Sequence, residues 1–211
     1  AVKLSPKKPF SWASGWKSPI YCDNRKTLSY PAVRTYIRQQ FTQAINTGFG
    51  RPDMIAGVAT GGIAHGALVA HDLGLPFVYV RSSAKEHGMK YQVEGDLTTG
   101  RSVVVVEDLV STGKSSLAAV QALREEGCDV KGMVSIFTYG FDEAIRAFER
   151  EKVKLQYLTN YEVLLEQALR DGYITEQDRA SLDEWRKDPA NWGQSAAKKE
   201  KPLSETPTAS N

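Results

Sequence analysis

A run of four valines, Val103–Val106, is the sequence feature that most constrains the fold of this chain. A continuous β-branched run of this kind is typical of a strand that is covered on both faces, as in a parallel sheet. Two adjacent carboxylates, Glu107 and Asp108, follow the run, and a turn of small residues leads from them into a helix predicted over 115–126. Strand, turn and helix in this order predict one unit of an α/β fold.

The other segments repeat this alternation of strands and helices. Apolar residues at three-to-four spacing indicate helices, and short apolar runs bounded by glycine or proline indicate strands. Thr175 and Asp178 stand at the two positions of a capping box, which predicts where the last helix begins. The polar residues 82–100 are expected to form a long loop. The predicted strands cover 53–59, 77–81, 101–107, 131–138 and 154–158, and the predicted helices cover 31–47, 63–73, 115–126, 142–151, 161–169 and 175–186.

This order of elements predicts an α/β fold with a central parallel sheet flanked by helices. Such sheets bind ligands at the carboxyl ends of their strands, so the loops after the first three predicted strands are candidate sites. With 211 residues, of which 41% are hydrophobic and 25% charged, the chain can bury one sizeable core. We expect a small N-terminal segment over 1–30, the α/β core over 31–193 and a disordered tail over 194–211.

Charge and composition exclude several functional classes. The formal net charge of +2 is close to neutral and gives no reason to expect a nucleic-acid partner. No apolar stretch approaches the roughly 20 residues that span a bilayer, and the polar first ten residues do not resemble a secretory signal. Cys22 and Cys128 lie far apart and are expected to be free thiols in a reducing cytosol. We therefore expect a cytoplasmic protein with no membrane or nucleic-acid partner.

The segment after the valines has the chemistry of a sugar-phosphate site. Small side chains and Gly113 let backbone N–H groups approach a phosphate, and the N-terminus of the following helix adds a partial positive charge. Carboxylates repel phosphate, so the acid pair suits a hydrogen-bond donor such as a sugar hydroxyl. We assign substrate binding to the consecutive residues Glu107, Asp108, Leu109, Val110, Ser111, Thr112, Gly113, Lys114 and Ser115.

Two other interpretations of this segment stay open. In the first, the carboxylates only cap the helix and Gly113 only makes the turn. In the second, Gly113-Lys114-Ser115 ends a Walker A loop, which would bind ATP. That motif requires a glycine five residues before Gly113, where this chain has Asp108. A carboxylate at that position would face the triphosphate.

A second candidate segment begins at Arg81. In an extended chain alternate side chains point to the same side, so Arg81, Lys85 and His87 would gather around one anion such as a pyrophosphate. Three glycines between residues 88 and 100 provide flexible points for a lid that closes over substrate. The other interpretation is a solvated surface loop with incidental charges.

Both segments resemble a known family. EDLVSTGKSS resembles the phosphoribosyl diphosphate (PRPP) signature of the type I phosphoribosyltransferases, which implies that Glu107 and Asp108 bind the ribose 2- and 3-hydroxyls and that the turn binds the 5-phosphate. The pattern R-x-x-x-K-x-H-G is similar to the catalytic loop of the orotate phosphoribosyltransferases within that family. It implies catalytic roles for Arg81, Lys85 and His87, exerted in the neighbouring subunit of a homodimer.

The resemblance extends to the N-terminal segment 1–30, which we call the hood segment. In the family it covers the pyrimidine, which implies that Tyr21 offers a ring face and that Lys17 or Arg25 favours the orotate carboxylate. Two further assignments follow from the same resemblance: Thr60-Gly61 as the pyrophosphate-binding turn and Ser111 as a contact of orotate.

The resemblance also implies a reaction. The expected activity transfers the phosphoribosyl group of PRPP to orotate, giving orotidine 5'-monophosphate and pyrophosphate in de novo pyrimidine (UMP) biosynthesis. Mg2+ is the implied cofactor, arriving with PRPP near Asp108, and its direct protein ligands stay open. Two alternatives remain: a phosphoribosyltransferase for another base, and a regulatory protein of the same fold that senses PRPP.

Overall fold

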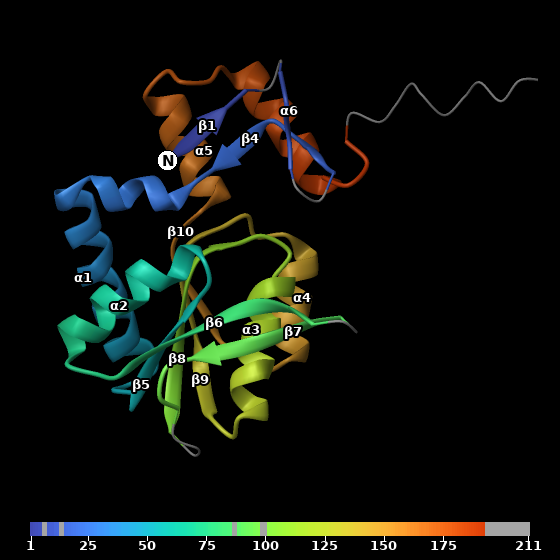
Figure 1. Cartoon of the computed structure of the whole chain (residues 1–211). Helices are drawn as coiled ribbons and strands as arrows, with labels where there is room; N and C mark the ends of the chain where they lie inside the picture. The colour runs from blue at the N-terminus through green and yellow to red at the C-terminus, as the bar shows by residue number, and fades with distance from the viewer. Residues whose placement is uncertain (6–7, 13–14, 86–87, 98–100, 193–211) are drawn as a thin grey trace, which may run out of the picture.

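The centre of the molecule is a six-stranded sheet with strand order β10-β9-β8-β5-β6-β7 (Figure 1). A computed structural model describes residues 1–5, 8–12, 15–85, 88–97 and 101–192, without the side chains of 82–91, so the tail predicted over 194–211 lies outside it. Every strand pairing in this sheet is parallel except that of β6 with β7, which confirms the predicted fold class. The strands are β5 (Met54–Val58), β6 (Phe77–Lys85), β7 (Gly88–Glu94), β8 (Ser102–Val110), β9 (Asp129–Thr138) and β10 (Leu155–Asn160).

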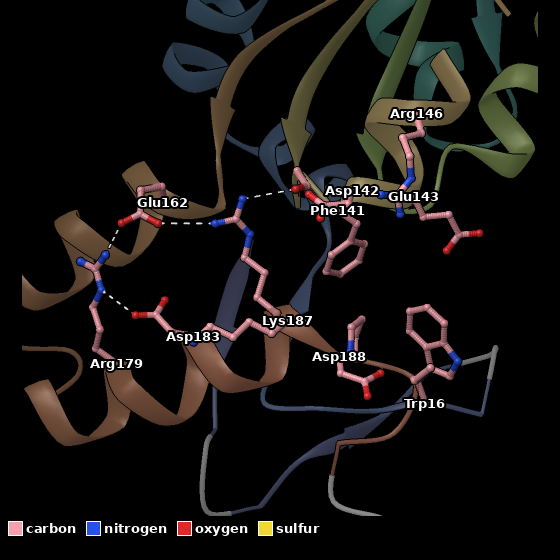
Figure 2. A pocket seen from close by; sticks show the side chains of 14 residues that line it. Trp16, Phe141, Asp142, Glu143, Arg146, Glu162, Arg179, Asp183, Lys187 and Asp188 are labelled. Atoms are coloured by element: carbon pink, nitrogen blue, oxygen red, sulfur yellow. Dashed lines mark hydrogen bonds and ion pairs between the residues drawn. The ribbon is translucent and has the colours of Figure 1, made fainter. Parts of the chain in front are cut away.

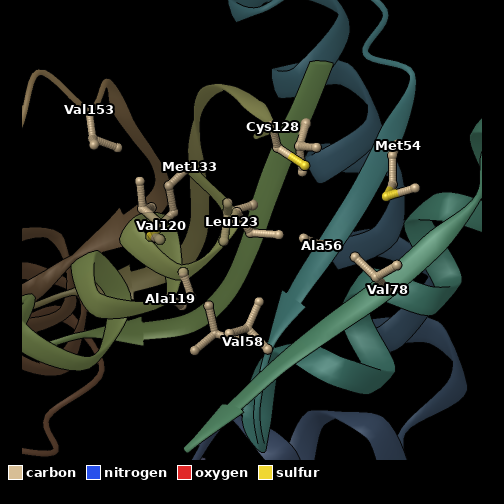
Figure 3. Packing of buried hydrophobic residues seen from close by; sticks show 14 of the residues in the cluster. Met54, Ala56, Val58, Val78, Ala119, Val120, Leu123, Cys128, Met133 and Val153 are labelled. Atoms are coloured by element: carbon tan, nitrogen blue, oxygen red, sulfur yellow. The ribbon is translucent and has the colours of Figure 1, made fainter. Parts of the chain in front are cut away.

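Helices cover both faces of the sheet because its central strands are apolar on both sides. Val104 and Val106 of β8 pack with the helices on one face, and Val103 and Val105 pack with those on the other. All four valines are fully buried, which confirms the doubly covered strand predicted from them. Figure 3 shows the second of these two clusters. The covering helices are α1 (Pro31–Gly48) and α2 (Gly61–Leu73) on the first face and α3 (Lys114–Glu125) and α4 (Asp142–Arg150) on the second.

Both ends of the described chain meet in an apolar layer beyond the carboxyl ends of β9 and β10 (Figure 1). Trp185 lies at its centre, fully buried and in ring contact with Tyr139 and Phe141. Its indole Nε1 donates a hydrogen bond to the carbonyl of Lys17 at 3.1 Å, which joins the two ends of the chain. We call this layer the cap layer; it consists of β1 (Val2–Leu4), β2 (Phe10–Ser11), β3 (Lys17–Ser18), β4 (Ile20–Cys22), α5 (Tyr161–Arg170) and α6 (Glu176–Lys187).

A short 3-10 helix, η1 (Asn24–Ser29), connects the cap layer to α1. Apolar residues from α5 and α6 thus share one cluster with the hood segment, while the domain boundaries at residues 30 and 193 stay a prediction. Within the described part of the chain, no helix combines the length and the apolar character needed to cross a bilayer.

The prediction of one long loop over 82–100 is wrong, because two strands extend into this segment. β6 continues to Lys85 and β7 returns antiparallel beside it, with Lys85 opposite Gly88 at the end of the hairpin. β7 carries a short apolar alternation, Met89-Tyr91-Val93, but it lies between Gly88 and Gly95 in an otherwise polar segment, which weakens it as a strand signal. Strand pairing, however, needs only backbone N–H and C=O groups, which every residue except proline supplies.

β8 is also longer than predicted. It pairs with β9 as far as Val110, so Leu109 and Val110 belong to the strand and the turn begins at Ser111. The remaining predicted strands and helices are confirmed to within a few residues at their ends. The capping box of α6 also forms as predicted, at Thr175 and Asp178.

Replacing Trp185 by alanine should destabilise the protein by about 3–5 kcal/mol, because the change leaves a large cavity in the cap layer and removes the bond to Lys17. The free energy of unfolding in urea measures this effect. Tyr173→Ala is the matched control, since Tyr173 belongs to the same region but is 82% exposed. Equal losses in the two variants would contradict the packing described for the cap layer.

Candidate active site

The acid pair opens into a cavity at the carboxyl end of β8. The cavity has a volume of about 330 Å³. Two predicted segments, Thr60-Gly61 and the acid pair, meet in it, as expected for the ends of neighbouring parallel strands. Its lining consists of Cys22, Asp23, Arg25, Val58, Ala59, Thr60, Gly61, Glu107, Asp108, Leu109 and Ser115.

The turn after β5 packs directly against the acid pair. A Cβ atom at Gly61 would overlap the carboxyl group of Asp108, and one at Gly62 would overlap the carbonyl oxygen of Val106. Gly62 is required for this approach because it meets backbone, whereas a side chain at Gly61 would displace the Asp108 carboxyl group. The start of α2 is therefore held against β8, with the Asp108 carboxyl group lying over Gly61.

Glu107 is almost fully buried, with 5% of its surface exposed. Its Oε1 accepts a hydrogen bond from the backbone N–H of Asp108 at 2.9 Å, and its Oε2 accepts one from the Ser116 hydroxyl at 3.0 Å. Burial, followed by the adjacent Asp108 carboxylate, raises the pKa of Glu107 well above its ordinary value. Glu107 thus stabilises the end of β8 from the protein interior, through its hydrogen bonds with the Asp108 backbone and Ser116.

Asp108 is only half-buried and lines the cavity beside Gly61. Burial raises its pKa, and hydrogen bonding with Glu107 and the charge of Arg25 act in the opposite direction. Because both oxygens of Glu107 already accept hydrogen bonds within the protein, Asp108 is the better placed of the two acids to accept hydrogen bonds from a ligand.

The predicted phosphate turn runs from Ser111 to the start of α3. Gly113 adopts a left-handed conformation with φ of 81° at the N-cap, and a Cβ there would lie 2.9 Å from the ring of Phe148. No side chain of the described residues caps α3. Its first N–H groups therefore stay available to an anion, and the helix dipole favours negative charge at this end.

The hood segment contributes a charged wall to the cavity. Asp23 and Arg25 form an ion pair at 2.7 Å, and the hydrogen bond from Arg25 lowers the pKa of Asp23. Cys22 lies beside them, and burial raises the pKa of its thiol to about 12, so it stays protonated. Between Asp23 and Arg25, the side chain of Asn24 turns inward and its Nδ2 donates a hydrogen bond to the Asp108 carbonyl at 2.7 Å.

Lys17 and Tyr21, which the resemblance assigned to base binding, do not line this cavity. The ammonium of Lys17 donates a hydrogen bond to the Ser11 hydroxyl at 2.7 Å. Tyr21 is 39% exposed and packs against Phe10, with 5.8 Å between ring centroids. Their roles in base binding stay a prediction.

The predicted catalytic residues lie on the β6–β7 hairpin. Arg81 forms an ion pair with Glu94 of β7 at 2.7 Å and is largely exposed. Lys85 is the last residue of β6, with its side chain outside the described part, and His87 lies outside the described residues altogether. The structure therefore does not test the convergence of these three residues on one anion.

A second, larger cavity of about 710 Å³ lies between α6 and the start of α4 (Figure 2). Arg179 pairs with both Glu162 and Asp183, and Arg186 pairs with Glu162 at 3.6 Å. Trp16 and Phe141 form an aromatic wall. None of the predicted substrate-binding residues lines this cavity, and its cations are matched by a similar number of carboxylates, so its size alone does not make it a phosphate site.

Comparison with known proteins agrees with this geometry. The phosphoribosyl transferase domain family matches residues 27–163. The orotate phosphoribosyltransferase of Phocaeicola vulgatus is 59% identical over 192 residues, which cover 91% of both chains. That of Listeria innocua is 54% identical over 193 residues, 92% of both chains. The chain belongs to the orotate phosphoribosyltransferase family. The crystal structure of the orotate phosphoribosyltransferase from Aeropyrum pernix superposes with a TM-score of 0.72 at 30% identity, covering 83% of this chain and 94% of that one.

Within this phosphoribosyltransferase fold, three residues of the site escaped sequence reasoning: Asp23, Asn24 and Ser116. Asp23 and Asn24 belong to a polar group that directly follows an apolar strand, which is a weak signal of a site. Ser116 is the third residue of α3, where a serine usually faces solvent, and here it is 1% exposed and donates a hydrogen bond to Glu107.

The raised pKa of Glu107 predicts a pH effect on stability. Folded protein holds the Glu107 proton more tightly than the unfolded chain, so this contribution is complete below the ordinary value of 4.5 and is lost as pH rises through the higher folded pKa. Glu107→Gln cannot ionise. The free energy of unfolding of the wild type minus that of Glu107→Gln should therefore fall as pH rises from 4.5.

Urea unfolding of both proteins across this range measures the difference, and the exposed Glu149→Gln variant supplies the baseline. If the difference in free energy of unfolding between the wild type and Glu107→Gln stayed flat or rose with pH, the raised pKa of the buried Glu107 would be contradicted.

Proposed function

We propose that this chain is an orotate phosphoribosyltransferase, which transfers the phosphoribosyl group of PRPP to orotate and releases pyrophosphate. The observation that carries this assignment is the packing of Asp108 against Gly61 at the carboxyl end of β8, beside the uncapped start of α3. Identity of about 60% with orotate phosphoribosyltransferases over 91% of the chain supports orotate as the base. The product, orotidine 5'-monophosphate, places the reaction in pyrimidine (UMP) biosynthesis.

The phosphate turn and the acid pair bind the phosphoribosyl group. Backbone N–H groups at the start of α3, with the hydroxyls of Ser111, Thr112 and Ser115, hold the 5-phosphate. Asp108 accepts hydrogen bonds from the ribose hydroxyls, and Glu107 positions Asp108 by accepting a hydrogen bond from its backbone N–H. The negative charge of Asp108 stabilises the positive charge that develops on the sugar ring as pyrophosphate leaves.

The turn Thr60-Gly61 and the hairpin act on the leaving group. Thr60 and Gly61 lie beside Asp108 and present backbone groups to the pyrophosphate. Arg81, Lys85 and His87 supply donors that neutralise its growing charge and exclude water when the hairpin closes over the substrate. In this proposal the hairpin acts in the neighbouring subunit of a cytoplasmic homodimer.

Mg2+ fits this site as a companion of the substrate. Among the described residues there is no group of three or more histidine, cysteine or acidic side chains that could hold a metal ion by itself. Mg2+ is commonly bound through one or two carboxylates together with substrate phosphates and water. Asp108 would supply such a carboxylate, and the ion would neutralise charge on the pyrophosphate.

Assays with a panel of four bases test the assignment. With PRPP and Mg2+ present, orotate should be consumed, as followed by its absorbance, while uracil, adenine and hypoxanthine should give no product. Faster turnover of another base would identify a phosphoribosyltransferase with different specificity. Binding of PRPP without turnover of any base would instead favour a regulatory protein that senses PRPP.

Asp108→Asn should weaken PRPP binding by tenfold or more, roughly the effect of losing one charge-assisted hydrogen bond. Isothermal titration calorimetry measures the dissociation constant without turnover. Asp129→Asn is the control, because Asp129 lies exposed at the opposite, amino-terminal end of β9. Unchanged affinity in Asp108→Asn would remove this carboxylate from the ribose site.

Lys85→Ala should lower turnover on the order of 100-fold, the usual cost of removing one transition-state donor. The protein should still fold, because Lys85 lies at the tip of an edge hairpin. Lys131→Ala, at the amino-terminal end of β9, is the matched control. Wild-type turnover in Lys85→Ala would exclude this lysine from the mechanism.

A further inference from the structure

Asp108 lies where β8 extends beyond the end of the neighbouring strand β5. β5 pairs with β8 as far as Val106, and in the described part of the chain no other strand pairs with β8 on this side beyond that residue. On the other side, β9 pairs with Glu107 and Leu109. The N–H and C=O groups of Asp108 must therefore find partners other than a strand, because buried backbone groups are costly to leave unpaired.

Two side chains supply these partners. The Glu107 carboxylate accepts from the N–H of Asp108 at 2.9 Å, and the Asn24 carboxamide donates to its carbonyl at 2.7 Å. The peptide groups of Asp108 are thus fixed on both sides. Its carboxyl group is left to face Gly61 and the cavity.

Asn24 is itself held from several directions. It is 4% exposed, and its Oδ1 accepts a hydrogen bond from the Cys22 thiol, with a distance of 3.4 Å. Its backbone carbonyl accepts a hydrogen bond from the Thr27 hydroxyl at 2.6 Å. The residues before and after it, Asp23 and Arg25, line the cavity. A shift of Asn24 would therefore move both the support of Asp108 and the charged wall of the hood segment.

His65 of α2 lies beside the backbone of Asn24. Its ring is 2% exposed and packs edge-on against Phe41, with 6.4 Å between ring centroids. Burial lowers the pKa of His65, and the backbone of Asn24 acts in the opposite direction. Nε2 is buried and has no hydrogen-bond partner among the described residues.

We infer that Asn24 is a positioning residue for the phosphoribosyl site, and that His65 acts through it. The inference rests on the proposed function. α2 begins at Gly61, which contacts Asp108, and four residues later carries His65, whose ring lies beside the backbone of Asn24. α2 and Asn24 therefore hold Asp108 from two sides, one through its carboxyl group and the other through its carbonyl.

Four single variants and the Asn24→Leu/His65→Leu double variant test this arrangement. Asn24→Leu keeps the branching and the number of heavy atoms of the side chain and removes the donor to Asp108. His65→Leu removes the polar ring beside the Asn24 backbone, whereas His65→Asn restores an N–H group there. His71→Asn is the control, since His71 is an exposed histidine nearly two turns further along the same helix.

The readouts are the dissociation constant of PRPP and the separate KM values for PRPP and orotate. We expect Asn24→Leu to raise the dissociation constant and KM for PRPP by about tenfold, with a smaller change in KM for orotate. His65→Leu should show the same split and His65→Asn should recover most of the loss. The double variant should lose no more PRPP affinity than Asn24→Leu alone, because both residues act on one contact.

Wild-type PRPP affinity in folded Asn24→Leu and His65→Leu would overturn the inference, as would fully additive losses in the double variant. Thermal unfolding of each variant separates these outcomes from a general loss of structure. If the wild-type protein itself failed to bind PRPP, the proposed function would fail, which this design distinguishes from failure of the positioning role alone.

Discussion

The close approach of Gly61 to Asp108 is the contact on which the rest of the site depends. It is possible because Gly61 has no side chain and because β5 and β8 are adjacent parallel strands that end at the same edge of the sheet. The same contact brings the start of α2 beside the start of α3. Two helix N-termini and a pair of acids thus surround one small cavity. In the proposed function, the helix N-termini face the phosphate groups and the acids face the sugar hydroxyls.

Electrostatics explains why the two acids are unequal. Burial and the adjacent Asp108 carboxylate favour the protonated form of Glu107, whereas the hydrogen bonds it accepts from the Asp108 backbone and from Ser116 act in the opposite direction. Asp108 is less buried and has Arg25 nearby, which favours its charge. Glu107 therefore acts as a structural carboxyl group and Asp108 faces the cavity, although the two acids are adjacent in the sequence.

The valine run and the small-residue turn predicted the central strand, the fold class and the position of the cavity, because these features depend on local sequence. The β6–β7 hairpin escaped prediction, since its strands are stabilised by backbone pairing at the sheet edge and the alternation of Met89, Tyr91 and Val93 is short and lies between two glycines. The contact between Asn24 and Asp108 joins residues 84 positions apart, which no local pattern can indicate. The packing of α5 and α6 with the hood segment likewise depends on long-range contacts around Trp185.

The most direct test of this account is a crystal structure of the protein with ribose 5-phosphate, which carries the monoester and the pentose without the leaving group. The account predicts the phosphate on the N–H groups between Ser111 and Ser115 and the ribose hydroxyls within hydrogen-bonding distance of the Asp108 carboxylate. A ligand bound instead in the larger cavity between α6 and α4, or a cavity at Asp108 left empty at saturating ligand, would contradict it.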